Sequence, residues 1–119
     1  MKNKYLVLIS GIMGFSAVAL GAFGAHGLKD ALSEHLLETY KTGVLYHLIH
    51  SVVLLAIALA GKEQFIRSFW FFLTGIILFS FSLYIYAITQ ITTFALITPI
   101  GGVSLLAGWL LVIIEGLKK

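Results

Sequence analysis

The sequence contains no cysteine and one proline, and charged residues make up only 11% of its 119 residues. Without cysteine the chain cannot form a disulfide, a thiolate metal site, an iron–sulfur cluster or a thiol redox relay. A soluble domain carries about 25% charged and about 45–50% apolar residues, whereas this chain is 60% hydrophobic. The composition excludes a water-soluble core and predicts an integral membrane protein.

Charged residues are absent from three long stretches, 5–25, 42–61 and 68–114. A helix of about 20 apolar residues crosses the hydrocarbon core of a bilayer. The first two stretches therefore hold one crossing each, and the third holds two, separated by the polar segment TQITT at 89–93. We predict a single all-α membrane domain over 1–119, a four-helix bundle with spans at 5–25, 42–60, 68–88 and 94–114.

The positive charges predict the orientation of these spans. Lys and Arg mark the cytoplasmic side of a membrane protein. One side of the predicted bundle carries Lys2, Lys4, Lys62, Arg67, Lys118 and Lys119, and the other carries only Lys29 and Lys41. We therefore expect both termini to face the cytoplasm. These charges lie at the ends of apolar segments, as topology signals do, and give no support for nucleic-acid binding.

The connection between the first two spans has an amphipathic pattern. Leu28, Leu32 and Leu36 recur every four residues, and the charged residues fall mainly elsewhere around the helix. We predict a helix over 28–41 that runs into the second span. The pattern fits a helix lying on the outer membrane surface, and it fits equally a solvated helix that caps the bundle with its apolar face inward.

Small residues recur along one face of the first and fourth spans. Because lipid gives helices no hydrophobic reason to associate, close approach over small residues is a usual source of contact. We expect packing within the bundle, and dimerisation is the alternative use of such a face. The residues are Ser10, Gly14, Ala17, Gly21 and Gly24 in the first span and Gly101, Gly102, Ser104 and Gly108 in the fourth.

The single proline, Pro99, lies about one turn into the fourth span, before Gly101 and Gly102. Proline removes a backbone hydrogen bond and clashes with the preceding turn, so we expect a kink or a broken first turn. The freed carbonyl could be satisfied by Thr98 and the neighbouring helices, or it could line a functional cavity.

The histidines are the sharpest functional signal. His47 and His50 share a helix face, and the predicted spans place them one to two turns below the outer surface, with His26 at a similar depth. Ionisable residues inside a membrane usually face the bundle interior and mark a functional site. We predict a ligand-binding or structural polar cluster made of His26, Tyr46, His47, His50, Ser80, Ser82, Tyr84, Thr98 and Pro99.

Three roles remain open for this cluster. The histidines could hydrogen-bond to Ser80, Ser82, Tyr84 or Thr98 and join helices. They could couple to protonation or contact a ligand. Imidazoles also suit metals and haem, so His26, His47 and His50 with a nearby acid could form a ligand set. An H-x-x-H pair alone is weak evidence, and we assign neither a metal nor a cofactor.

Four segments together resemble a known family: GAFGAHGL at 21–28, YHLIHS at 46–51, LFSFSLY at 78–84 and ITPIGGVSLLAGW at 97–109. They resemble the uncharacterised four-span membrane proteins of the YgdD/YwdK type, domain-of-unknown-function family 423 (UPF0382). The resemblance implies a multi-pass protein of the bacterial inner membrane with no agreed biochemical activity. Gln is common in the family where this chain has His47, so the resemblance favours His50 over His47 as an obligatory ligand.

The leading functional hypothesis is a non-enzymatic membrane protein whose polar outer half binds a lipid, a small molecule or a partner subunit. One alternative is a small transporter or permease component that acts as an oligomer. Another is an accessory protein that uses its histidines to bind a metal, haem or quinone. The expected partners are the lipid bilayer and either further copies of the chain or another membrane protein. An enzyme is not expected, because the sequence contains no recognisable nucleophile or acid–base pair.

Overall fold

The computed structural model describes residues 2–118, with side chains from Lys4 to Lys118, and its elements are all helical. Four helical segments are long and apolar enough to cross a membrane, which confirms the predicted four-helix fold. The third is built from four consecutive elements and covers 63–89. The elements are α1 (Lys2–Gly27), α2 (Glu34–Ala60), η1 (Glu63–Phe65), α3 (Ile66–Gly75), η2 (Ile76–Phe81), α4 (Ser82–Thr89) and α5 (Thr92–Leu117).

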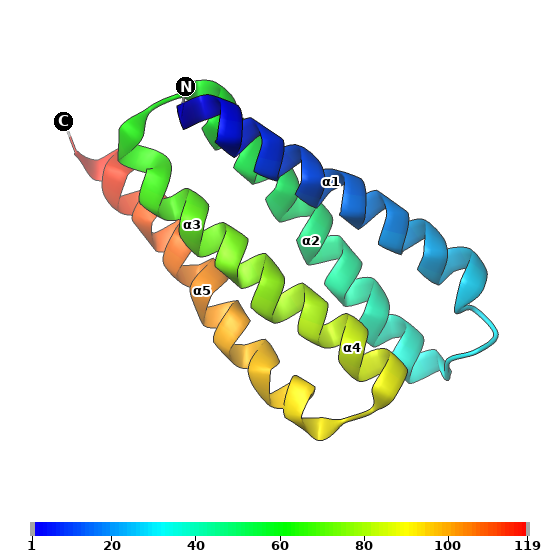
Figure 1. Cartoon of the computed structure of the whole chain (residues 1–119). Coiled ribbons are helices and arrows are strands. Elements are labelled where there is room, and N and C mark those ends of the chain that lie inside the picture. Colours follow the sequence, from blue (N-terminus) through cyan, green and yellow to red (C-terminus); the bar gives the residue numbers. More distant parts are fainter. Residues whose placement is uncertain (1, 119) are drawn as a thin grey trace.

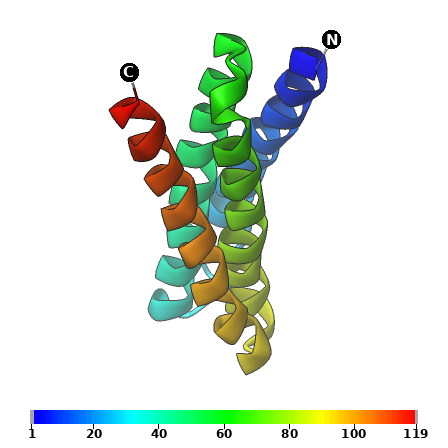
Figure 2. The same cartoon turned by 90° about the vertical axis from the view of Figure 1, so that its left-hand side faces the viewer.

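The helices form an elongated bundle with extents of 51 × 25 × 18 Å. Both chain ends lie at one end of the bundle, and the connections at 28–33 and 90–91 lie at the other (Figure 1). α1 packs against α2, and α5 packs against α3, η2 and α4. Figure 2 shows α1 and α5 on opposite sides of the bundle, so α2 and the third span form its centre.

The connection between the first two spans differs from the predicted helix over 28–41. Residues 28–33 form turns, and α2 begins at Glu34 and continues without a break through the second span. Ser33 causes this start, because its backbone is extended and its side chain accepts a hydrogen bond from the Leu36 N–H at 3.2 Å. Leu28 is buried, and Leu32 and Leu37 pack against the same cluster, so the apolar side chains of this region face the bundle.

The small-residue face of α1 packs against α2. Ser10 and Ala17 are buried, and a Cβ added to Gly24 would overlap the Tyr40 ring. A Cβ at Gly21 would lie 3.1 Å from the Val44 side chain. Of the two uses predicted for this face, the structure therefore shows packing within the chain.

The small residues of α5 allow close contact with the third span. A Cβ on Gly101 would overlap the backbone of Phe79, and one on Gly108 would lie 2.6 Å from the Phe72 ring. The Ser104 hydroxyl donates a hydrogen bond to the carbonyl of Phe71 at 2.8 Å. Gly102 differs from Gly101, because a Cβ there would meet only the Phe79 ring, at 3.7 Å.

A helical irregularity lies in the third span. α5 continues through Pro99, so the expected broken turn does not form. In contrast, η2 is a six-residue π-helix, whose wider turn replaces the usual hydrogen-bonding pattern. Gly101 packs directly against its backbone at Leu78 and Phe79. The glycine of α5 therefore leaves the space that this wide segment occupies.

Candidate ligand-binding groove and its histidines

His47 joins three helices through its imidazole ring. Its Nδ1 lies 2.8 Å from the Tyr84 hydroxyl of α4, and its Nε2 lies 3.1 Å from the Ser16 hydroxyl of α1. The Ser16 hydroxyl donates its proton to the Met13 carbonyl at 2.9 Å, so its oxygen accepts from Nε2–H and Nδ1 accepts from Tyr84. The side chain of His47 is fully buried. Both ring nitrogens of the buried imidazole are therefore hydrogen-bonded, and burial of His47 leaves none of its polar side-chain atoms unpaired.

His50 joins α2 to α5. Its Nδ1–H donates to the carbonyl of Tyr46 at 2.8 Å, because a carbonyl can only accept. The indole N–H of Trp109 donates to Nε2 at 3.1 Å, and the two rings meet edge to face with centroids 5.9 Å apart. These partners determine the tautomer of an uncharged ring, and both nitrogens of His50 are occupied.

The structure does not bring the three histidines together as a metal-ligand set. His26 is exposed at the end of α1, and both ring nitrogens of His47 and His50 already have partners. Within residues 4–118, no group of three His, Asp or Glu side chains is arranged to hold a metal ion. The geometry matches the interhelical hydrogen-bonding role, and Tyr84 is the partner that the sequence correctly anticipated.

The remaining members of the predicted cluster lie apart from the histidines. Ser82 and Thr98 join α4 to α5 through hydroxyls 2.6 Å apart. Ser80 is fully buried, and its hydroxyl has no hydrogen-bond partner among the described residues. Tyr46 and Pro99 line a groove, described next. The nine predicted residues therefore form separate contacts and not one polar cluster.

The depth of the histidines depends on where α2 enters the membrane. His47 is at the midpoint of α2, because this helix begins at Glu34 and not near residue 42. A 27-residue helix is about 40 Å long, which exceeds the ~30 Å hydrocarbon core. The excess length lies at the start of α2, where Glu34, Glu38 and Lys41 are charged, so the depth of one to two turns for His47 stays a prediction.

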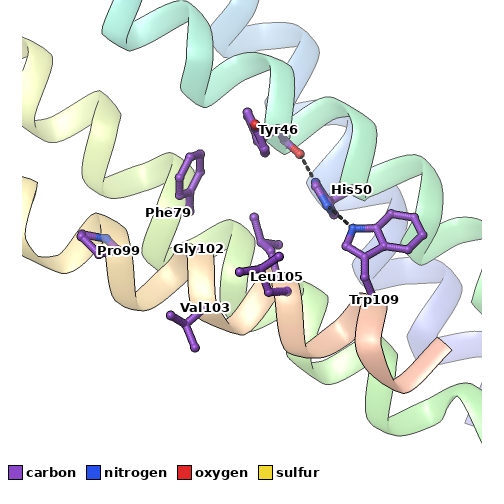
Figure 3. A pocket seen from close by; sticks show the side chains of 9 residues that line it. Tyr46, His50, Phe79, Pro99, Gly102, Val103, Leu105 and Trp109 are labelled. Carbon is purple, nitrogen blue, oxygen red and sulfur yellow. Dashed lines mark hydrogen bonds between the residues drawn. The ribbon is translucent and has the colours of Figure 1, made fainter. Parts of the chain in front are cut away.

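A groove with a volume of about 390 Å³ lies between α2 and α5, with the third span behind it. Figure 3 shows Pro99 toward one end and the hydrogen-bonded pair of His50 and Trp109 at the other. Two lining residues, Val103 and Leu106, are 65% and 70% exposed, so the groove opens sideways on the surface that faces lipid. Its lining is apolar apart from one edge and is made by Tyr46, His50, Phe79, Pro99, Gly102, Val103, Leu105, Leu106 and Trp109.

Sequence reasoning missed Ser16 and Trp109, which are the direct partners of the two histidines. Trp109 is the only Trp in the fourth span, and its indole N–H needs an acceptor inside a membrane. That requirement was a usable signal for a histidine partner. Ser16 gave no such signal, because a serine in a membrane helix often bonds to its own backbone.

Four helices that are long and apolar enough to cross a membrane define an integral membrane protein of the four-span class. A family described as "Protein of unknown function (DUF423)" matches residues 20–102. The chain is 38% identical to the UPF0382 membrane protein YwdK of Bacillus subtilis, over 97% of this chain and 98% of the relative. It is 36% identical to the UPF0382 inner membrane protein YgdD of Escherichia coli, over 99% and 93%.

A UPF0382 membrane protein of Haemophilus influenzae is 45% identical, over 92% of this chain and 90% of the relative. No solved structure matches the chain significantly. The chain belongs to the DUF423 family, and the resemblance of its four segments to that family is confirmed.

Proposed function

We propose that this protein is a non-enzymatic membrane protein that binds the apolar chain of a lipid in the groove between α2 and α5. The observation that supports this proposal is a lateral, uncharged groove of about 390 Å³ at the middle of the spans. This volume falls within the range of about 300–1,000 Å³ that is typical of ligand pockets. At this depth a bilayer offers hydrocarbon chains to an opening on its side.

The groove also has the build of a binding site. Close packing at Gly101 and Gly108 holds α5 against the third span. The hydrogen bond from Trp109 to His50 fixes the distance between α5 and α2 at one end of the groove. Gly102 faces the groove without filling it. An occupant therefore meets preformed walls and loses little free energy in reorganising them.

We further propose that both termini face the cytoplasm, which is supported by the excess of Lys and Arg at that end of the bundle. In this orientation the Pro99 end of the groove points toward the outer leaflet, and the pair of His50 and Trp109 closes its inner end.

Native mass spectrometry of the full chain, purified in mild detergent, tests lipid binding. We expect the wild type to retain lipid, and Gly102→Leu to lose it because the new side chain occupies the groove. Gly11→Leu is the matched control, since Gly11 lies on α1 and a Cβ there meets open space. Equal retention by both variants, or no retained lipid in the wild type, would refute the groove as a binding site.

A further inference from the structure

Tyr46 presents an unused hydrogen-bonding group at the groove. Its ring packs against Phe79 with centroids 4.8 Å apart and stacks nearly parallel to His50, at 9° and 6.0 Å. Figure 3 shows Tyr46 and Phe79 next to each other on the groove wall. The Tyr46 hydroxyl makes no hydrogen bond to the part of the chain that the structure describes, although its main-chain carbonyl accepts from His50.

The other polar atoms that line the groove already have partners. The indole N–H of Trp109 donates to Nε2 of His50, and Nδ1–H of His50 donates to the Tyr46 carbonyl. No charged residue lines the groove. The chemistry left for an occupant is therefore a single phenolic hydroxyl in otherwise apolar surroundings, which favours an uncharged ligand with a hydrogen-bond acceptor.

The depth of Tyr46 restricts the ligand further. Tyr46 lies five residues beyond Lys41, the last charged residue of α2, which is about 7.5 Å along the helix axis. A phospholipid headgroup is charged and stays at the surface, outside the charge-free segment of α2 that holds this hydroxyl. The carbonyl of an uncharged lipid can enter the hydrocarbon, because its cost of desolvation is offset when it accepts a hydrogen bond.

We infer that the groove selects an uncharged lipid whose carbonyl oxygen, in an ester or a quinone ring, accepts a hydrogen bond from Tyr46. This inference rests on the proposed function of the groove. It assigns Tyr46 as the residue that recognises the ligand, while Phe79, Val103 and Leu106 contact its apolar chain.

Three probes with the same decyl chain test this assignment: a decyl-substituted benzoquinone, decyl acetate and decylbenzene. Binding of each to the full chain is measured by native mass spectrometry as a function of concentration. We expect one or both carbonyl probes to bind the wild type about two- to tenfold more tightly than decylbenzene, which is the contribution of one hydrogen bond. Preference for the quinone or for the ester identifies the source of the carbonyl.

Tyr46→Phe should remove that preference and leave the binding of decylbenzene unchanged. Tyr86→Phe, which removes a hydroxyl from a half-buried tyrosine outside the groove, is the matched control and should keep the preference. Equal binding of all three probes by the wild type, or a preference that survives Tyr46→Phe, would overturn the inference. If Gly102→Leu still abolishes binding, the groove itself stands. Failure of every probe to bind the wild type would overturn the groove as well.

Discussion

At the scale of single residues, the interior of this bundle is organised by two histidines whose nitrogens are all paired. The His47 ring packs against Phe81 and Tyr84, and the His50 ring packs against Phe72. An unpaired polar atom in such surroundings costs free energy, whereas a paired one joins helices. The histidines therefore contribute specific polar contacts between helices, in addition to contacts such as that between Ser82 and Thr98.

Removing the Tyr84 hydroxyl should destabilise the bundle. Tyr84→Phe leaves Nδ1 of the buried His47 without its partner at 2.8 Å, and we expect the free energy of unfolding to fall by about 1 kcal/mol. Denaturation by SDS in mixed micelles measures this change. Tyr86→Phe removes the same atom from a hydroxyl that makes no hydrogen bond within residues 4–118, and it should change the stability little. Equal losses in the two variants would contradict a role for the His47 contact.

The sequence predicted the histidine pair and Tyr84, but it could not predict the complete set of contacts. An intramembrane histidine signals a polar contact by its own cost. Its partner, however, is chosen by how the helices pack: Ser16 is 31 positions from His47, and Trp109 is 59 positions from His50. The glycine contacts between α5 and the third span determine which side chains of α5 face α2. No local sequence pattern shows which residues of the third span these glycines will contact.

At the scale of helices, glycines determine how closely the elements approach. Gly24 accommodates Tyr40 of α2, and Gly101 accommodates the π-helical backbone of η2. The sequence predicted four spans correctly because charge-free length is a direct requirement of the bilayer. It misplaced the start of α2, because the amphipathic pattern continues across Ser33 while the chain folds back there. It gave no indication of η2, since a π-helix arises from packing and not from composition.

Adjacent glycines of α5 give a matched pair of substitutions. Gly101→Ala forces a Cβ into the backbone of Phe79, and we expect the free energy of unfolding to fall by about 1–3 kcal/mol. Gly102→Ala places its Cβ 3.7 Å from the Phe79 ring, an ordinary contact, so stability should stay the same or rise by up to about 1 kcal/mol. SDS denaturation of both variants provides the comparison. A smaller loss in Gly101→Ala than in Gly102→Ala would show that the π-segment does not pack as described.

At the scale of the whole molecule, the two ends of the bundle differ in charge. The end with both termini carries most of the Lys and Arg, and there Lys118 and Arg67 lie 3.0 and 4.0 Å from the buried Glu115. The opposite end holds the turns at 28–33 and 90–91. This asymmetry is the basis of the proposed orientation of the groove relative to the two leaflets.

Fusion of reporter enzymes after Lys119 tests the orientation. A reporter that works only in the cytoplasm should be active there, and an export-dependent reporter such as alkaline phosphatase should be inactive, because positively charged ends stay inside. Fusions within the 28–33 turn should give the reverse pattern. An active alkaline phosphatase after Lys119 would invert the proposed orientation and direct the Pro99 end of the groove to the inner leaflet.

The central claim is that a lipid chain occupies the groove between α2 and α5, and magnetisation transfer between lipid and protein methyl groups tests it most directly. In methyl-labelled protein reconstituted in nanodiscs, Val103 and Leu106 of the groove should show strong, persistent cross-peaks to acyl chains, which weaken in Gly102→Leu. Val18 on the exposed face of α1 is the reference for ordinary lipid contact, being 63% exposed. Cross-peaks of equal strength at Val18 and in the groove, unchanged by Gly102→Leu, would contradict the account.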